Sequence, residues 1–585
     1  MEKILILAEK PTAMKKIAYS LFPKCKIIFS NKVPYFVTYY NNKVYYVVSA
    51  LGHLYKLEPQ NNFFDYPIFN ADWEIVDSKA EKFAKLIKNL AKDVNKVIVA
   101  TDYDIEGYVI AWNIIRYLIG LDKEIKRMKF STLAKNELIK SFNNLIEFEI
   151  NQVNAGLARH YLDWYWGINL SRALMISLRK VSNEKKILSI GRVQGPALYL
   201  VYLREKEIEN FKPEKYYKIK AILEKDGIEF FVFYIEEKIR DLNKAKEIFE
   251  KCKGKKCRLI QIKEEEYKLN PLPPFNTTDL QEEAYYAFGF KPEYTLKIAE
   301  SLYLKGYISY PRSSSQKLKG INIFPILNSL NKIPFYSYLV KEILSFDKIE
   351  VTEGKKEDPA HPAIIPTDEI PKYKELSKQE VLLYDLIVRR FLVCLHKPAI
   401  RKSIKIVAKI DNFLFQNVFH QTVKENWIKI YRKFLNLQED LLPKLSLSEE
   451  ISVKDLKLIE EKTKPPARYT RASLIKELEA RNLGTKTTRA EIVKTLYDRG
   501  YIVNDKMKIT SLGKAVVETF LKYCPEILSE KLTREFEKKT DEIIEGKNSL
   551  ENVLNEAKSF LSGVLKKIKE YEKDIGNILV NSLSK

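Results

Sequence analysis

Cysteine is scarce in this sequence, and the few cysteines lack the spacing that a zinc site or a disulfide framework would need. The 585 residues include five cysteines, none of them in a Cys-x₂-Cys pair. Cys252 and Cys257 lie closest together, and no second Cys or His pair stands near them. We therefore expect reduced thiols in a cytoplasmic protein, with no bound zinc.

Long apolar runs and nucleotide-binding loops are missing as well. The N-terminal segment MEKILILAEKP (1–11) is far too short for a signal peptide or a membrane span, so no membrane association is expected. No Gly-x₄-Gly-Lys-Ser/Thr loop occurs, which argues against ATP as a cofactor.

Basic residues, in contrast, are in large excess. The chain has 100 Lys and Arg against 77 Asp and Glu, a net charge of +23. Such an excess favours a polyanionic partner, and nucleic acid is the commonest one. A basic surface without such a partner is the alternative that charge alone leaves open.

The order of apolar patterns predicts several domains of different classes. The first 150 residues alternate strand and helix patterns, with buried strands at 3–9 and 96–100, so we expect a parallel sheet packed with helices. Helices are expected over 151–210, at 277–288, at 292–305 and after 470, and strands over 214–270 and near 400–419.

Carboxylates follow two of the predicted strands. Glu9 ends the first strand, and Asp102, Asp104 and Glu106 follow the strand 96–100. The carboxyl ends of parallel strands meet at one crevice, where these side chains would converge. Grouped hard oxygen ligands suit Mg²⁺. A surface acidic run without a metal is the alternative for either motif alone.

Tyr310 differs from the other 34 of the 35 tyrosines in its surroundings. The segment 302–315 predicts a helix end at Gly306, a short strand, and then Tyr-Pro-Arg, which places Arg312 on the same strand face as Tyr310. A phenol of pKa about 10 needs nearby cations to attack a phosphate, and a guanidinium matches phosphate oxygens. A simple turn is the alternative.

Together these segments resemble the type IA DNA topoisomerases, most closely an archaeal topoisomerase III-like branch. ILAEKP (6–11) and ATDYDIEG (100–107) resemble the metal site of the Toprim domain, although Tyr103, Ile105 and Tyr108 replace the family's Pro, Arg and Glu. That replacement puts the outer contacts of the site in doubt.

The resemblance runs from about residue 3 to residue 560, and two further segments contribute to it. Residues 275–315 resemble the family's active-site region and 358–367 its histidine segment. The resemblance implies that Tyr310 becomes joined to a 5′ phosphate, that Arg312 and His361 steady the phosphate, and that Lys10 gives a proton to the leaving 3′ oxygen. It also implies one or two Mg²⁺ ions on four acids: Glu9, Asp102, Asp104 and Glu106.

Aromatic and basic residues alternate over 159–194, as single-stranded DNA binding by stacking and phosphate neutralisation requires. A core helix with solvated basic residues is the alternative, and Arg192 could instead pair with an acidic neighbour. The resemblance assigns DNA contacts to His53, Trp164, Arg172, Arg179, Ser189, Ile190, Gly191, Arg192, Val193, Gln194, Arg312 and Arg489.

The implied architecture is multidomain, α/β plus α and β: a Rossmann-like Toprim domain followed by the family's toroid. The toroid comprises a helical gate domain that binds single-stranded DNA, a β arch, and a detachable domain that carries the nucleophile. The expected ranges are 1–150 for the Toprim domain, 151–212 with 455–585 for the helical domain, 213–272 with 392–454 for the arch, and 273–391 for the nucleophile domain.

The implied function is passage of DNA strands through a transient single-strand break, which relaxes negative supercoils or decatenates without ATP. We expect a monomer, associated with the nucleoid, whose cleavage substrate is single-stranded DNA. The topoisomerase half of a split reverse gyrase with a helicase partner is the main alternative. A Toprim nuclease and a non-catalytic single-strand binder are two others.

Overall fold

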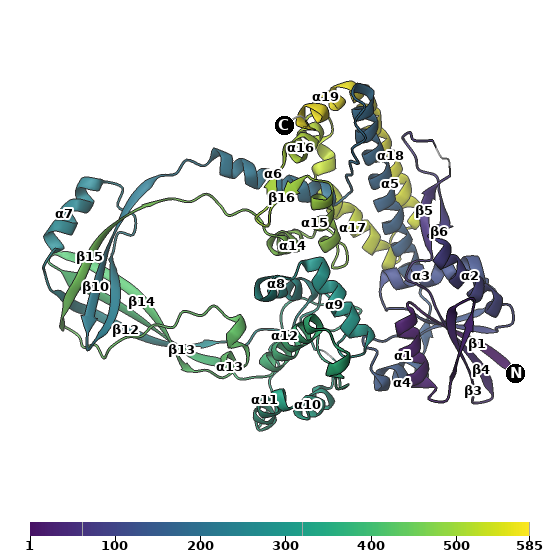
Figure 1. The fold of residues 1–585 in the computed structure, drawn as a ribbon, viewed down its shortest axis with the longest axis horizontal. Coiled ribbons are helices and arrows are strands. Elements are labelled where there is room, and N and C mark those ends of the chain that lie inside the picture. The colour runs from purple at the N-terminus through teal and green to yellow at the C-terminus, as the bar shows by residue number, and fades with distance from the viewer. Residues whose placement is uncertain (61–62, 319, 584–585) are drawn as a thin grey trace.

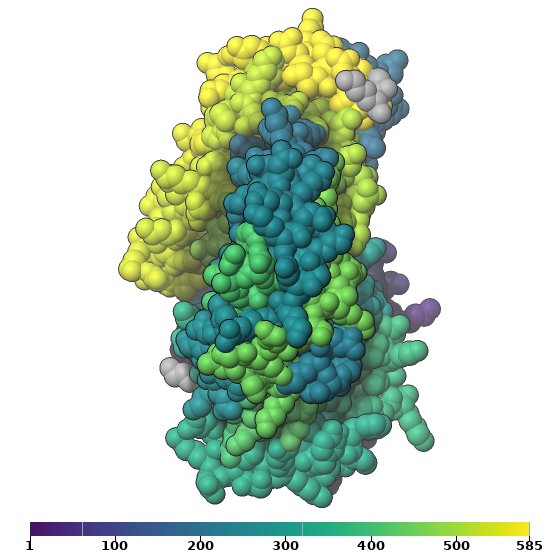
Figure 2. All heavy atoms as spheres, turned by 90° about the vertical axis from the view of Figure 1, so that its left-hand side faces the viewer, coloured from purple at the N-terminus to yellow at the C-terminus, as the bar shows by residue number. Residues whose placement is uncertain are grey.

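The computed structural model describes residues 1–60, 63–318 and 320–583. Its elements form an open ring, with the N-terminal sheet at one end and a β-barrel at the other (Figure 1). Viewed from the barrel end, the C-terminal helices lie above the barrel and the region that carries Tyr310 lies below it (Figure 2). None of the described helices is long and apolar enough to cross a membrane.

The N-terminal sheet has seven strands in the order β2-β3-β4-β1-β7-β8-β9. The inner strands are parallel, since β1 pairs with β4 and β7 and β7 pairs with β8, whereas β2-β3-β4 and β8-β9 are antiparallel. The expectation of a parallel sheet thus holds for the central strands and is wrong at both edges, where tight turns join β2, β3 and β4 and a longer helical connection joins β8 to β9. The strands are β1 (Glu2–Ala8), β2 (Lys26–Ser30), β3 (Val33–Tyr40), β4 (Lys43–Ser49), β7 (Lys96–Ala100), β8 (Glu124–Arg127) and β9 (Ile146–Glu147).

Helices cover this sheet, and a small hairpin extends from it (Figure 1). The helix that follows β7 is an α-helix that continues as a π-helical turn. The elements are α1 (Pro11–Leu21), the hairpin strands β5 (Tyr55–Pro59) and β6 (Ala71–Ile75), α2 (Ser78–Ala91), α3 (Ile105–Ile114), the π-helical turn Ile115–Ile119 and α4 (Lys135–Asn143).

A long helix, α5 (Ile150–Val181), joins the sheet to the helical region. It crosses α3 closely at Gly156, where a Cβ would lie only 2.4 Å from Val109 Cγ2. The missing side chain of this glycine permits the close approach. Its Tyr165 and Trp166, expected in a DNA groove, are buried in the helical core instead. The region also contains α6 (Gln194–Asn210), α14 (Arg471–Ala480), α15 (Arg489–Asp498), β16 (Ile502–Val503), β17 (Lys508–Ile509), α16 (Ser511–Tyr523), a 3₁₀ turn (Pro525–Leu528), α17 (Glu530–Ile544), α18 (Leu550–Glu570) and α19 (Glu572–Leu583).

The expected β arch contains a closed barrel of order β10-β11-β14-β13-β12-β15. Its strands come from two stretches of sequence, which the region that carries Tyr310 separates. Cys252 and Cys257 are buried in its apolar core, where burial raises the pKa of each thiol to about 12. The elements are β10 (Lys215–Lys225), β11 (Ile228–Tyr234), α7 (Leu242–Cys252), β12 (Cys257–Leu269), β13 (Ala399–Ile410), β14 (Phe413–Lys424) and β15 (Glu450–Lys462).

The region between the two halves of the barrel is helical and carries Tyr310. The strand predicted before Tyr310 is not formed: Ile308 makes one isolated bridge to Pro366. Ser309 N–H donates to Ile365 O and Tyr310 N–H to Ser131 O, so successive residues bond to different segments and cannot build one ladder. The elements are α8 (Thr277–Phe288), α9 (Pro292–Leu304), α10 (Ile323–Asn331), α11 (Pro334–Leu344), a 3₁₀ turn (Tyr373–Glu375) and α12 (Lys378–Cys394). Two short elements that follow β14 in the chain, α13 (Ile428–Tyr431) and a 3₁₀ turn (Arg432–Phe434), lie next to this region, and α13 contacts α12.

Candidate active site

Three of the predicted acids meet at the carboxyl ends of two paired strands. The register of β1 and β7 places Ala8 opposite Ala100, so Glu9 and Asp102 emerge from neighbouring strands. The Asp102 N–H donates to Glu9 Oε2 at 3.2 Å, and the Asp104 carboxylate caps α3 by accepting from the Gly107 N–H at 2.7 Å. The main chain therefore orients these carboxylates.

These acids are buried close enough to oppose one another's ionisation. Burial, with the Asp102 and Asp104 charges, raises the pKa of Glu9 well above its usual range, and burial with Asp104 raises the pKa of Asp102 to about 6. Burying like charges together is costly unless a cation neutralises them. The three carboxylates thus fit a hard divalent ion such as Mg²⁺.

Two tyrosines reach this cluster from the region that follows the first half of the barrel. Tyr310 Oη donates to Asp104 Oδ2 at 2.6 Å, and Tyr303 Oη donates to Asp102 Oδ1 at 2.9 Å. Burial and the carboxylates of Asp104 and Asp102 raise the pKa of Tyr310 well above its usual range. The phenol is therefore protonated at neutral pH and needs a base to become a nucleophile.

The two basic residues predicted for catalysis meet at an acid that the sequence did not single out. Arg312 pairs with Glu300 of α9, and Lys10 Nζ lies 3.8 Å from Glu300 and 3.9 Å from Glu9. The Nε atom of Arg312 is buried without a hydrogen-bond partner among the described residues. Arg312 thus keeps one donor free beside Tyr310.

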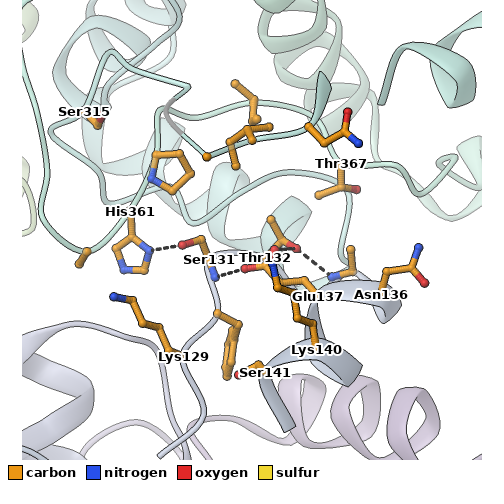
Figure 3. Close-up of a pocket in the computed structure, with 18 of the residues that line it drawn as sticks. Lys129, Ser131, Thr132, Asn136, Glu137, Lys140, Ser141, Ser315, His361 and Thr367 are labelled. Carbon is orange, nitrogen blue, oxygen red and sulfur yellow. Dashed lines mark hydrogen bonds between the residues drawn. The ribbon is translucent and has the colours of Figure 1, made fainter. Parts of the chain in front are cut away.

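His361 lies directly against the tyrosine ring, with the ring centroids of His361 and Tyr310 4.5 Å apart. Its Nδ1 is 3.1 Å from Ser131 Oγ, beside Lys129 at the edge of a cavity of about 800 Å³ (Figure 3). Burial and the Lys486 charge lower its pKa to about 4, so the ring is neutral at pH 7. Within the described chain, its buried Nε2 has no partner.

Glu106, the fourth predicted metal ligand, binds two histidines in this structure. Its Oε2 lies 2.8 Å from His160 Nε2 and 3.0 Å from His53 Nε2. Burial alone would raise the pKa of Glu106, but the charge and hydrogen bond of His160, with those of His53, hold it well below its usual range. Sequence reasoning missed His160, since a lone histidine within a helix carries no local motif.

Arg127 of β8 supplies the outer contacts that the replaced motif residues left in doubt. Its guanidinium donates to Thr101 Oγ1 at 3.0 Å and to Asp102 O at 2.6 Å. It also lies over the Tyr108 ring at 4.0 Å from the centroid. The buried Arg127 guanidinium thus holds the acidic loop in place through its main chain. Tyr108, which stands where the family has Glu, packs against this guanidinium.

The comparisons with known proteins agree with this geometry. A family model described as DNA topoisomerase matches residues 147–555, and a Toprim domain model matches residues 4–133. DNA topoisomerase 1 of Pyrococcus horikoshii is 46% identical over 587 residues, covering 98% of this chain and 85% of that protein. The chain belongs to the type IA DNA topoisomerases.

Other relatives give the same assignment. DNA topoisomerase 1 of Methanocaldococcus jannaschii is 43% identical and covers 99% of this chain and 76% of that protein. The structure of full-length topoisomerase I from Thermotoga maritima matches with a TM-score of 0.75 at 27% identity, over 96% of this chain and 90% of that one. This chain is a DNA topoisomerase, and the relatives do not support the split reverse gyrase alternative.

Several residues predicted to contact DNA border cavities of this topoisomerase. A cavity of about 640 Å³ is lined by Asp104, Glu106 and Arg489, and a second of about 380 Å³ is lined by Gly191, Arg192, Val193 and Gln194. Ser189 accepts a hydrogen bond from Arg499, and Ile190 is buried in the helical core. Their contacts with DNA stay predictions.

The predicted basic contacts already have partners within the chain. Arg192 is buried and pairs with Asp163 at 3.1 Å and Glu537 at 2.9 Å, the arrangement that the sequence left open as the alternative. Arg489 donates to the Leu483 and Gly484 carbonyls. Arg172 and Arg179 lie against Phe64, at 5.2 Å and 4.4 Å from the ring centroid, and Trp164 packs against Tyr165.

Proposed function

We propose that this topoisomerase cuts one DNA strand through Tyr310, whose oxygen becomes joined to the 5′ phosphate while a 3′ hydroxyl is freed. The observation that carries the proposal is the 2.6 Å hydrogen bond from Tyr310 Oη to Asp104 Oδ2. It aims the phenol at the acids of the Toprim domain, which come from a distant part of the sequence.

Residues of this chain can accept and supply both protons that move in the cleavage step. The Tyr310 proton passes to Asp104, its hydrogen-bond acceptor, as the oxygen–phosphorus bond forms. The bond from phosphorus to the 3′ oxygen breaks, and Lys10 donates a proton to that oxygen. Religation is the reverse, so the energy of the broken phosphodiester is kept in the phosphotyrosine and ATP is not needed.

Arg312 and His361 are proposed to hold the scissile phosphate. Among the described residues, neither the buried Nε of Arg312 nor the buried Nε2 of His361 has a hydrogen-bond partner. A buried polar atom without a partner is destabilising and rare, and a phosphate oxygen would satisfy the Arg312 donor. His361 is neutral at pH 7 and can donate from Nε2 when Nδ1 accepts from Ser131.

Glu9, Asp102 and Asp104 would hold Mg²⁺, with Glu106 as a further ligand if it leaves its histidines. The ion would supply positive charge at the reacting phosphate. The contacts of Asp102 and Asp104 with Tyr303 and Tyr310 are hydrogen bonds rather than apolar packing. We therefore propose that this interface parts to pass a strand while the barrel stays intact, in a monomer acting on single-stranded segments of nucleoid DNA.

The test is Tyr310→Phe, with Tyr384→Phe as the matched control. Tyr384 is buried in the same region, and its hydroxyl has no hydrogen-bond partner among the described residues. With Mg²⁺ and no ATP, we expect wild type and the control to relax negatively supercoiled plasmid and to trap the 3′-labelled end of a single-stranded oligonucleotide. Tyr310→Phe should do neither yet bind the oligonucleotide, and cleavage by this variant would place the nucleophile elsewhere.

A further inference from the structure

His53, Glu106 and His160 form a compact group beside the acidic cluster, yet the proposed cleavage chemistry leaves both histidines unused. They come from three places: the loop after β4, the first turn of α3 and the middle of α5. One ligand atom from each lies within 4.8 Å of the other two. The fold therefore brings together three metal-ligating side chains that are far apart in sequence.

The distances are close to those that a metal ion would impose. In a tetrahedral site with bonds of about 2.0–2.1 Å, neighbouring ligand atoms lie about 3.3 Å apart. The two histidine nitrogens are now 2.8 and 3.0 Å from Glu106 Oε2. An ion would need these contacts to lengthen by only ~0.3–0.5 Å, which side-chain rotation can supply.

The ligand set decides which ions suit the group. Two imidazoles and one carboxylate suit Zn²⁺ and related transition ions, whereas Mg²⁺ prefers oxygen ligands alone. Glu106 also lines the cavity of about 640 Å³, and the side chains of His53, Glu106 and His160 are 30%, 25% and 26% exposed. An ion can therefore enter from solvent, and three protein ligands leave a coordination position open.

We propose that His53, Glu106 and His160 bind one transition-metal ion of the Zn²⁺ class, at a site that shares no ligand with Glu9, Asp102 and Asp104. Binding would fix Glu106 on the histidine side. The proposal does not rest on Tyr310 chemistry, since metal binding can be measured without DNA.

The test is titration of the full-length protein with Co²⁺ in millimolar Mg²⁺, followed by displacement with Zn²⁺. We expect one Co²⁺ per chain, with the visible absorption of a tetrahedral nitrogen and oxygen site, and its loss on adding Zn²⁺. Because each histidine would be a direct ligand, His53→Ala and His160→Ala should each weaken binding at least about 100-fold. Asp102→Asn with Asp104→Asn should leave it unchanged.

His420→Ala is the matched control, because His420 is a partly buried histidine of β14 in the barrel. It should bind Co²⁺ as the wild type does. Thermal melting checks that each variant folds, and His53→Ala, which changes a loop, decides the matter if His160→Ala is unfolded. Absence of Co²⁺ binding, binding that survives both histidine changes, or binding lost only with the aspartates would overturn the proposal.

Discussion

The barrel and the active-site interface both bury apolar side chains, but the interface also buries hydroxyl and carboxylate groups against each other. The barrel encloses apolar side chains such as Ile219, Leu223 and Phe230, each no more than 3% exposed. The interface buries Tyr303 and Tyr310 against carboxylates. Opening the barrel would expose apolar surface at a cost of about 25 cal/mol per Å², whereas opening the interface would expose some apolar surface and return its polar groups to water. We therefore expect the interface to open more readily than the barrel.

Removing the carboxylates should have the largest effect on function. Asp102→Asn with Asp104→Asn should slow relaxation by at least about 10³-fold, because the cation loses its ligands and Tyr310 its base. The melting temperature should not fall, since the repulsion among Glu9, Asp102 and Asp104 is also removed. Relaxation rates and thermal unfolding measure both. Turnover with an unchanged Mg²⁺ midpoint would refute the metal assignment.

Creating a cavity in the barrel core should have the opposite result: it should lower stability and leave the cleavage chemistry intact. Phe230→Ala removes a ring that is 3% exposed and should destabilise the barrel by about 3–5 kcal/mol. Below the melting temperature, formation of the covalent adduct should continue. Ile235→Ala, which changes a side chain that is 44% exposed, is the control and should stay within about 0.5 kcal/mol. Equal stability of the two variants in denaturant unfolding would contradict an apolar barrel core.

Arg192 tests whether a buried cation binds DNA or the protein itself. Because Arg192 is paired with Asp163 and Glu537, Arg192→Ala should destabilise the helical region by about 3 kcal/mol and leave the salt dependence of single-strand binding unchanged. If Arg192 instead contacts a phosphate, the slope of log K against log [salt] should shrink by about 0.7. Melting temperature and salt slope, measured on the same variant, separate the two outcomes.

The effect at His361 appears only when the pH is lowered. Its pKa falls from 6.5 to about 4 on burial, so the folded state binds the proton less well than the unfolded state. This contribution to stability is present above pH 6.5 and is lost as pH falls toward 4, by up to about 3 kcal/mol.

Asp102 acts in the opposite direction, because its raised pKa favours the folded state at low pH. The difference in unfolding free energy between wild type and His361→Gln isolates the histidine, since Asp102 is present in both. That difference should change between pH 7 and pH 4, to the disadvantage of wild type. Parallel pH profiles would show that His361 titrates normally.

Local patterns in the sequence determined much of this protein. Strand ends carrying Glu9 and Asp102, and the Tyr-Pro-Arg segment at Tyr310, could be read because spacing and chain order encode them. Most helices and strands fell at the predicted ranges, since the period of apolar residues reflects which face is buried. The family followed from these same segments.

Tertiary structure alone decided which side chains meet. Tyr303 on Asp102, Glu300 on Arg312 and His160 on Glu106 are pairs without a local motif, and two of them join residues well apart in the chain. The same holds for Arg192. Its positive charge suggested a DNA contact, but in the fold it is buried and paired with Glu537. A charge pattern records that a residue needs a counter-charge. Whether protein or nucleic acid supplies it depends on packing between distant segments, which the pattern does not contain.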